Sequence, residues 1–171
     1  MRVRRQFIRK EAENLLLMYA PSAIPVPVET IAKRLGYEIR FVDDDSEMSG
    51  FLMRNKSSVI IGVNKNHSSN RQRFTIAHEI GHGMLHSSEA LYVDKRFRNE
   101  LSSQGTNAEE MEANLFAAEL LMPASQIRKS LKAIGNLDVE SDSEIDDLAN
   151  KYKVSRLAMS NRLTYLGHLC S

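Results

Sequence analysis

The sequence predicts an α+β fold, in which a small antiparallel sheet packs on two central helices and a helical pair follows towards the C-terminal end. Three short runs rich in β-branched and aromatic residues lie close together, at 37–42, 49–54 and 57–63. Apolar residues with helical spacing dominate the segments on both sides of these runs. A cluster of strands set between helical segments is typical of the α+β class.

The composition is that of an ordinary globular protein. The 171 residues suit one domain, or one domain with a small appendage. The net charge of +1 gives no indication that a nucleic acid or a membrane surface is a partner. The single cysteine, Cys170, argues against a disulfide framework, and no stretch approaches the roughly 18 apolar residues of a membrane span. We therefore expect a cytoplasmic protein without a membrane segment.

Two helices are predicted before the strands. Residues 3–20 carry an apolar stripe with helical spacing, and Pro21 ends this helix. The stripe consists of Ile8, Ala12, Leu15, Leu16 and Tyr19. A second, short helix begins around Pro27 and stops at Gly36.

The three strands are separated by turn-forming residues, so we expect them to pair as an antiparallel sheet or meander. The run SSVIIGVN (57–64) has two interpretations. As an edge strand, it would bind an extended peptide through main-chain hydrogen bonds. As an interior strand, it would fill the core.

The second half of the chain is helical. The two central helices contain RQRFTIAHEIGHGMLH (71–86) and TNAEEMEANLFAAELLMP (106–123), and a further short helix follows. Residues 143–167 are predicted to form a helix, a tight turn and a second helix. We expect residues 1–135 to form the main domain and residues 136–171 to form a helix-turn-helix-like segment packed on it.

The stretch HEIGHGMLH (78–86) contains three of the five histidines. Helical residues four apart lie about 6 Å apart along the axis, so His78 and His82 can direct ring nitrogens at one metal ion, and two neutral imidazoles suit zinc. Glu79 lies off this line, where it can reach a water molecule beside the metal, as in the His-Glu-x-x-His pattern of zinc hydrolases. Along a continuous helix His86 would lie about 12 Å from His78, too far to be a ligand.

The third ligand is expected to be a carboxylate from the second central helix. This helix offers Glu109, Glu110, Glu112 and Glu119. Glu110 shares a face with Asn114, which can accept the free N–H of a ligating histidine. Glu112 is the alternative third ligand. An acidic helix face that is simply solvated is the remaining interpretation.

Two further features surround the predicted site. Gly81 and Gly83 each cost about 1 kcal/mol relative to alanine inside a helix. They indicate either a close approach of the sheet or the substrate, or the end of the helix after His82. His86 and Tyr92 are candidate donors to a developing oxyanion. His86 can equally be a packed, hydrogen-bonded histidine.

RFTIAHEIGHGMLH followed by EEMEANLFAAELLMP resembles the ImmA/IrrE family of small metallopeptidases, over about residues 24–125. The upstream IPVPVETIAKRLGYEI and MSGFLMRNKSSVIIGVN match the usual lead-in of that family. The resemblance implies a thermolysin-like two-helix core with one zinc ion per chain. It implies that His78, His82 and Glu110 are the ligands and that Glu79 is the general base. The wider group often has Asp where this chain has Asn114.

The resemblance also implies that the substrate is a helix-turn-helix repressor, whose cleavage relieves repression of mobile-element or stress-response genes. The rival interpretation is a non-catalytic metal-containing module that binds a partner protein or DNA through its C-terminal helices. In that case Arg156, Asn161 and Arg162 would be exposed on the second helix of 143–167. Acidic residues at the start of the first helix oppose direct DNA binding. Glu79 favours the hydrolase, because a structural metal site needs no general base.

Overall fold

The computed structural model describes residues 2–45, 48–54, 57–86, 91–95, 104–135 and 142–167, with the backbone alone for 91–95, 104–107 and Asp142. These residues form seven helices and four strands. The helices are α1 (Arg5–Tyr19), α2 (Val28–Arg34), α3 (Ser69–Leu85), α4 (Gln104–Leu121), α5 (Ala124–Ile134), α6 (Asp142–Tyr152) and α7 (Arg156–Tyr165). The strands are β1 (Tyr37–Val42), β2 (Met48–Arg54), β3 (Val59–Asn64) and β4 (Leu91–Lys95).

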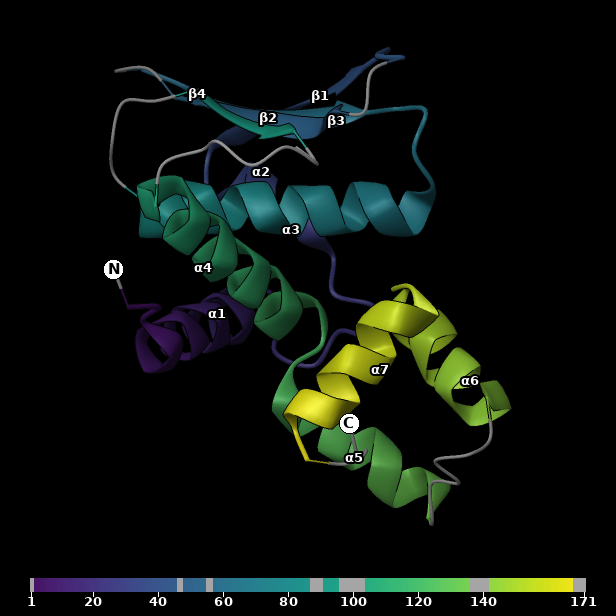
Figure 1. The fold of residues 1–171 in the computed structure, drawn as a ribbon. Helices are drawn as coiled ribbons and strands as arrows, with labels where there is room; N and C mark the ends of the chain where they lie inside the picture. The colour runs from purple at the N-terminus through teal and green to yellow at the C-terminus, as the bar shows by residue number, and fades with distance from the viewer. Residues whose placement is uncertain are drawn as a thin grey trace.

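The elements are arranged in layers around α3. The sheet covers one side of α3, and α4 crosses on the opposite side with α1 packed against it (Figure 1). Helices α5, α6 and α7 gather beyond the C-terminal end of α4 (Figure 1). The predicted α+β class is therefore confirmed. In the described part of the chain, no helix combines the length and apolar character that crossing a bilayer requires.

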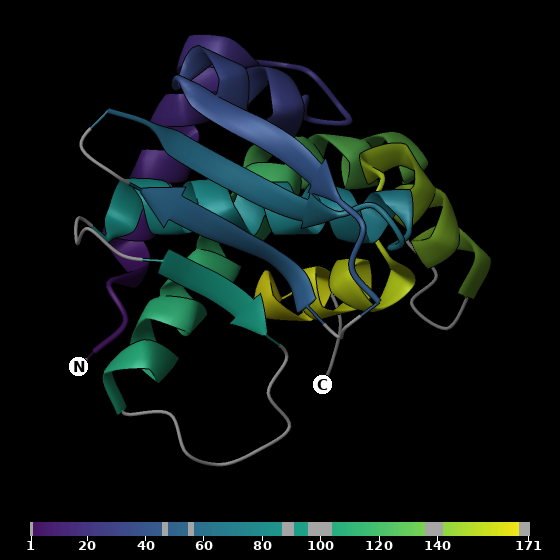
Figure 2. The ribbon, with the colours of Figure 1, turned by 90° about the horizontal axis from the view of Figure 1, so that it is seen from above.

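The sheet is mixed, which corrects the predicted antiparallel arrangement. The strand order is β1-β3-β2-β4, in which β3 runs parallel to β1 and antiparallel to β2, and β2 runs antiparallel to β4. Strand β3 lies between β1 and β2 (Figure 2), and its residues from Ile60 to Val63 are consecutive and buried. The edge-strand interpretation of SSVIIGVN is therefore wrong.

The predicted buried stripe of the first helix is present, and the C-terminal pair of helices shares the same core. Ile8, Ala12, Leu15 and Leu16 of α1 are buried, and Tyr19 is half-buried. Helices α6 and α7 contribute Leu148, Ala149, Met159 and Leu163, with Val154 between them, to the same hydrophobic cluster as α1, α3 and α4. The C-terminal helices therefore pack on the rest of the chain. A domain boundary at residue 135 stays a prediction.

Arg162 does not have the exposed position that DNA reading would require. It is only 2% exposed, its guanidinium pairs with both carboxylate oxygens of Glu119, and its Nε donates to the carbonyl oxygen of Met122 at 2.9 Å. The cause is that α7 turns this face towards α4. Arg156 is exposed and lies 3.4 Å from a carboxylate oxygen of Asp146.

Candidate metal centre

Helix α3 brings two imidazoles together. His78 and His82 are one turn apart, both are buried, and their Nε2 atoms lie 3.0 Å from each other. Their rings meet edge to face, with centroids 4.7 Å apart. The i, i+4 spacing alone produces this arrangement, because residues four apart lie on the same face of a helix.

Helix α4 supplies a carboxylate to the same point. Glu110 places Oε2 3.2 Å from Nε2 of His78 and Oε1 3.2 Å from Nε2 of His82. The two helices can approach closely because Gly81 faces α4. A Cβ at Gly81 would lie 3.2 Å from the Cα of Ala113 and from the ring of Phe116.

The two glycines of α3 therefore have different neighbours. Helix α3 continues to Leu85, so the predicted helix end after His82 is wrong. A Cβ at Gly83 would lie 2.7 Å from the ring of Tyr37, which belongs to β1. The absence of a side chain at Gly81 makes room for α4, and its absence at Gly83 makes room for the sheet.

The three donors fit a single divalent metal ion. His78, His82 and Glu110 offer ligand atoms that all lie within 4.8 Å of one another. Tetrahedral bonds of about 2.0–2.1 Å would hold donor atoms about 3.3 Å apart, close to the observed separations. Burial raises the pKa of Glu110, but the two neighbouring histidines outweigh burial and lower it to about 2. The carboxylate is therefore ionised, as a metal ligand must be.

Glu79 follows His78 on α3, so its side chain leaves the helix about 100° further round the axis. It is completely buried, with an exposure of 0%. Glu79 is thus next to His78 in the chain but does not belong to the cluster of three donors.

Asn114 holds the first histidine. Its Oδ1 lies 3.1 Å from Nδ1 of His78, one turn along α4 from Glu110. An amide oxygen only accepts, so His78 donates from Nδ1 and presents the lone pair of Nε2 to the donor cluster. The contact with His78 is the one that the sequence predicts for Asn114, and its role beside a metal ligand stays a prediction.

A longer chain of contacts holds the second histidine. His82 and His86 approach through their Nδ1 atoms at 3.1 Å, and Nε2 of His86 lies 3.3 Å from Oε2 of Glu112. The backbone N–H of Arg4 donates to Oε1 of Glu112 at 2.9 Å, and its Nε donates to the same oxygen at 3.0 Å. We call His82, His86 and Glu112 the buried chain, and the exposed Arg4 contacts its outer end.

Each proton in the buried chain has one consistent position. The hydrogen bonds from Arg4 lower the pKa of Glu112 to about 2 against the opposing effect of burial, so Glu112 is an acceptor. Burial lowers the pKa of His86, so its ring is neutral, donates from Nε2 to Glu112 and accepts at Nδ1. His82 then donates from Nδ1, which leaves its Nε2 lone pair for the donor cluster.

The other candidates from the sequence lie outside the donor cluster. Glu112, the alternative third ligand, is occupied by Arg4 and His86, and Glu109 is not part of the cluster either. His86 follows the last residue of α3, contacts Nδ1 of His82 and contributes no donor atom to the cluster. The backbone of Tyr92 pairs with Leu52 in the sheet, but its side chain lies outside the described residues, so its oxyanion role stays a prediction.

Sequence reasoning missed the contact between Arg4 and Glu112 of the buried chain. Arg4 and Glu112 are 108 residues apart, and no local spacing connects them. Arg4 also donates to the carbonyl oxygen of Leu85, and Arg54 donates to the carbonyl oxygen of His86 at 2.8 Å. Two arginines therefore satisfy the end of α3, where orphan carbonyl groups favour cations.

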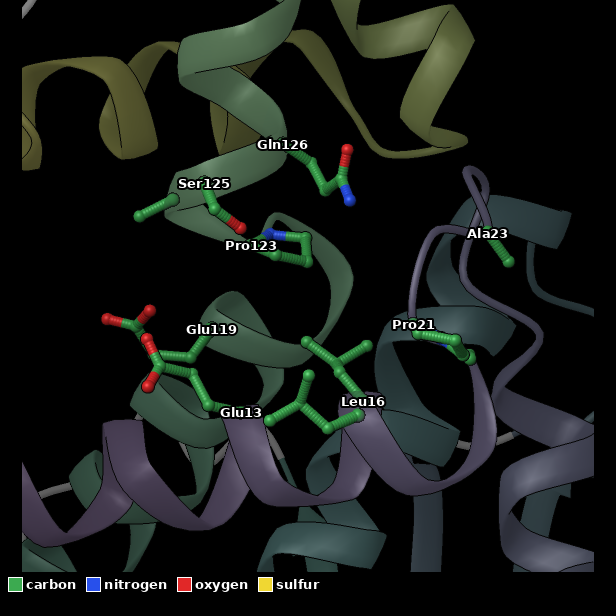
Figure 3. Close-up of a pocket in the computed structure, with 11 residues that line it drawn as sticks. Glu13, Leu16, Pro21, Ala23, Glu119, Pro123, Ser125 and Gln126 are labelled. Carbon is green, nitrogen blue, oxygen red and sulfur yellow. The ribbon is translucent and has the colours of Figure 1, made fainter.

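A cavity of about 170 Å³ lies elsewhere, between α1, α4 and the start of α5. Figure 3 shows Glu13 and Leu16 on its α1 side and Pro123, Ser125 and Gln126 on its α5 side. None of the three metal donors lines it. This cavity is not part of the metal centre.

Two crossing helices beneath a small sheet, with His-Glu-x-x-His on one and the distant glutamate on the other, form a candidate metal centre of the metallopeptidase type. The chain belongs to the peptidase family described as the IrrE N-terminal-like domain, which matches residues 32–164. The predicted membership of the ImmA/IrrE family is confirmed. The match extends into α7, so the C-terminal helices belong to the family's shared region.

Individual relatives agree with this membership. The chain is 24% identical over 168 residues to the metallopeptidase ImmA of Bacillus subtilis (strain 168), covering 87% of this chain and 95% of that protein. It is 34% identical over 77 residues to the uncharacterized immunity region protein 2 of Bacillus phage phi105, covering 45% of this chain and 46% of that protein.

A solved structure shares the fold. A Mycobacterium tuberculosis transcriptional regulator superimposes with a TM-score of 0.62 at 17% sequence identity, over 93% of this chain. The match spans only 46% of the regulator, so this chain corresponds to about half of that protein.

Proposed function

We propose that this protein is a zinc-dependent endopeptidase that cleaves a helix-turn-helix transcriptional repressor and thereby relieves repression. The observation that carries the proposal is the meeting of His78, His82 and Glu110 beside Glu79 in a member of a peptidase family. Similarity to a metallopeptidase and to a phage immunity-region protein supports a role in regulating mobile-element or stress-response genes, and cytoplasmic action is part of the proposal.

His78, His82 and Glu110 would hold the zinc ion and leave a fourth coordination position open. When bound, zinc would act as a Lewis acid that activates water and polarises a peptide carbonyl. The separations of 3.0–3.2 Å between the donor atoms support this assignment. Two neutral imidazoles and one carboxylate are a ligand set typical of catalytic zinc sites.

Glu79 would be the general base. Its carboxylate would accept a proton from the attacking water and deliver it to the nitrogen of the leaving amine. Its position directly after His78 on α3, as in the His-Glu-x-x-His pattern of zinc hydrolases, supports this role.

Asn114 and the buried chain would orient the two ligand histidines. Both imidazoles need a proton on Nδ1 for Nε2 to bind a metal, and each has an acceptor at Nδ1 in this arrangement. The ionised Glu112 at the far end of the buried chain would polarise His86 and, through it, His82. These partners would raise the basicity of the ligands and fix the planes of their rings.

The proposal is tested with zinc-loaded protein and co-expressed helix-turn-helix repressors, beginning with any that a neighbouring gene encodes. We expect cleavage that a chelator abolishes, and we expect Glu79→Gln to remove it while zinc content stays at one per chain. Glu110→Gln should lose zinc, whereas Glu109→Gln, on the same helix but outside the cluster, should retain it. Mass spectrometry of the new chain ends identifies the cleaved bond.

Two results would contradict the proposal. An uncut repressor in the presence of fully bound zinc would favour the non-catalytic module. Cleavage by Glu79→Gln at the wild-type rate would remove Glu79 from the mechanism. Generic peptides are the weaker substrates for this test, because the proposed substrate is a folded protein.

A further inference from the structure

A groove of about 650 Å³ lies where α3, α4 and α7 meet. We call it the α7 groove. Its apolar lining includes Phe74, Leu115, Ala118, Met122, Val154 and Leu157. Helix α7 lies beneath α3 and beside the C-terminal half of α4 in Figure 1. This volume and apolar character are typical of a ligand-binding cleft.

One end of the α7 groove adjoins the metal centre. Asn114 lines the groove and also contacts Nδ1 of His78 at 3.1 Å. Phe74, one turn before His78, lines it as well, and the two rings have centroids 6.1 Å apart. The groove therefore begins at two residues that contact His78, while none of the three donors lines it.

The far wall of the α7 groove presents apolar surface to solvent. Leu157, the second residue of α7, is 71% exposed, and Ala158 beside it is half-buried. An exposed leucine at the mouth of a cleft gains free energy when a ligand covers it. The ligand that covers this wall therefore contributes apolar side chains.

The charges that line the α7 groove have one sign. The groove is lined by the positively charged residues Arg5, Arg71 and Arg162 and by Tyr165. No Asp or Glu of the described residues lines it. Arg162 is buried against Glu119, whereas Arg5 of α1 is exposed and can face a ligand. Arg71 donates to the hydroxyl of Ser49 at 2.7 Å. A positive lining without acids favours a ligand that carries carboxylates.

We propose that the α7 groove binds the protein substrate on one side of the cleaved bond and selects an apolar segment that carries an acidic side chain. The inference rests on the proposed peptidase function. In this proposal the C-terminal helices take part in substrate recognition. Nucleic acid is the competing occupant, and the apolar Leu157 together with the burial of Arg162 opposes it.

The test measures binding separately from hydrolysis. Zinc-loaded full-length Glu79→Gln is titrated into a short fluorescent peptide of Leu, Val, Met and Glu, and into the same peptide with Lys in place of Glu. We expect the acidic peptide to bind about tenfold more tightly. Arg5→Glu should remove this preference, and Leu157→Ser should weaken binding of both peptides several-fold.

Matched controls separate the groove from the rest of the surface. Lys10→Glu places the same charge change on the exposed face of α1, and Met18→Ser removes an apolar side chain that is 68% exposed. Neither residue lines the groove, so neither change should alter the affinity for either peptide.

The outcomes distinguish the two proposals. If the repressor is cleaved but Arg5→Glu and Leu157→Ser behave like their controls, the groove proposal is wrong and the peptidase stands. If both variants change peptide binding as expected but no repressor is cleaved, the groove stands and the peptidase proposal fails. Binding of duplex DNA that depends on Arg5, with no binding of the acidic peptide, would overturn the groove proposal in favour of nucleic acid.

Discussion

Two glutamates on one face of α4, Glu112 and Glu119, have similar environments. They are seven residues apart, their exposures are 0% and 7%, and each pairs with an arginine distant in the sequence. Glu112 meets Arg4, and Glu119 meets Arg162. Burial and ion pairing alone do not distinguish them.

Their additional partners do distinguish them. Glu112 accepts from His86, which contacts a metal-donor histidine. Glu119 meets a second arginine, Arg9 of α1, at 3.1 Å. One carboxylate therefore belongs to the metal centre, whereas the other joins α1 and α7 to α4. The function of a buried charged residue therefore depends on the residues that its ion-pair and hydrogen-bond partners contact.

The largest expected effect is on folding. Glu119→Ala leaves the buried guanidinium of Arg162 without its carboxylate, which typically costs about 3–5 kcal/mol. We expect the free energy of unfolding, measured by urea denaturation, to fall by this amount, while the folded fraction binds zinc normally. Unchanged stability would show that this ion pair does not hold α7 on α4.

The second effect is on the metal. Glu112→Gln keeps the volume of the side chain but removes the charge at the end of the buried chain. We expect zinc affinity, measured by competition with a chromophoric chelator, to weaken about 10–100-fold, as for other partners of ligand histidines. Glu119→Gln is the matched control and should bind zinc like the wild type. Equal losses in both variants would remove the distinction between the two carboxylates.

The smallest effect belongs to the other histidine. Asn114 is exposed and neutral, so Asn114→Ala should weaken zinc affinity by no more than about tenfold. Asn114→Asp should bind zinc at least as tightly as the wild type, because a carboxylate accepts more strongly from Nδ1 of His78. A loss in Asn114→Ala as large as that in Glu112→Gln would show that the two histidines are held equally firmly.

The sequence predicted local features well. The run at 37–42 matches β1, and the i, i+4 spacing of His78 and His82 on a helix brings their Nε2 atoms together. Glu110 and Asn114 were accessible to sequence reasoning as well, because they are one turn apart on one helix. In each case the physical cause is the periodicity of a single element.

Non-local pairing was beyond the sequence. The parallel pairing of β1 with β3 joins strands that are separated by β2 in the chain. The residue pattern of a single strand does not indicate which other strand it pairs with. Arg162 has the position of an exposed recognition residue in a helix-turn-helix, and only the docking of α7 against α4 buries it. Arg4 reaches Glu112 across 108 residues by the same kind of tertiary contact.

The close fit at Gly81 links two properties that protein engineers usually treat separately. Replacing it with alanine would favour the helical state by about 1 kcal/mol, yet the added methyl group would press on Ala113 and Phe116 at 3.2 Å. Helix α4 would have to yield by a few tenths of an ångström and carry Glu110 away from both imidazoles. A substitution here that stabilises the helix would therefore weaken metal binding. Screens that select on heat resistance alone would favour variants that bind the metal less tightly.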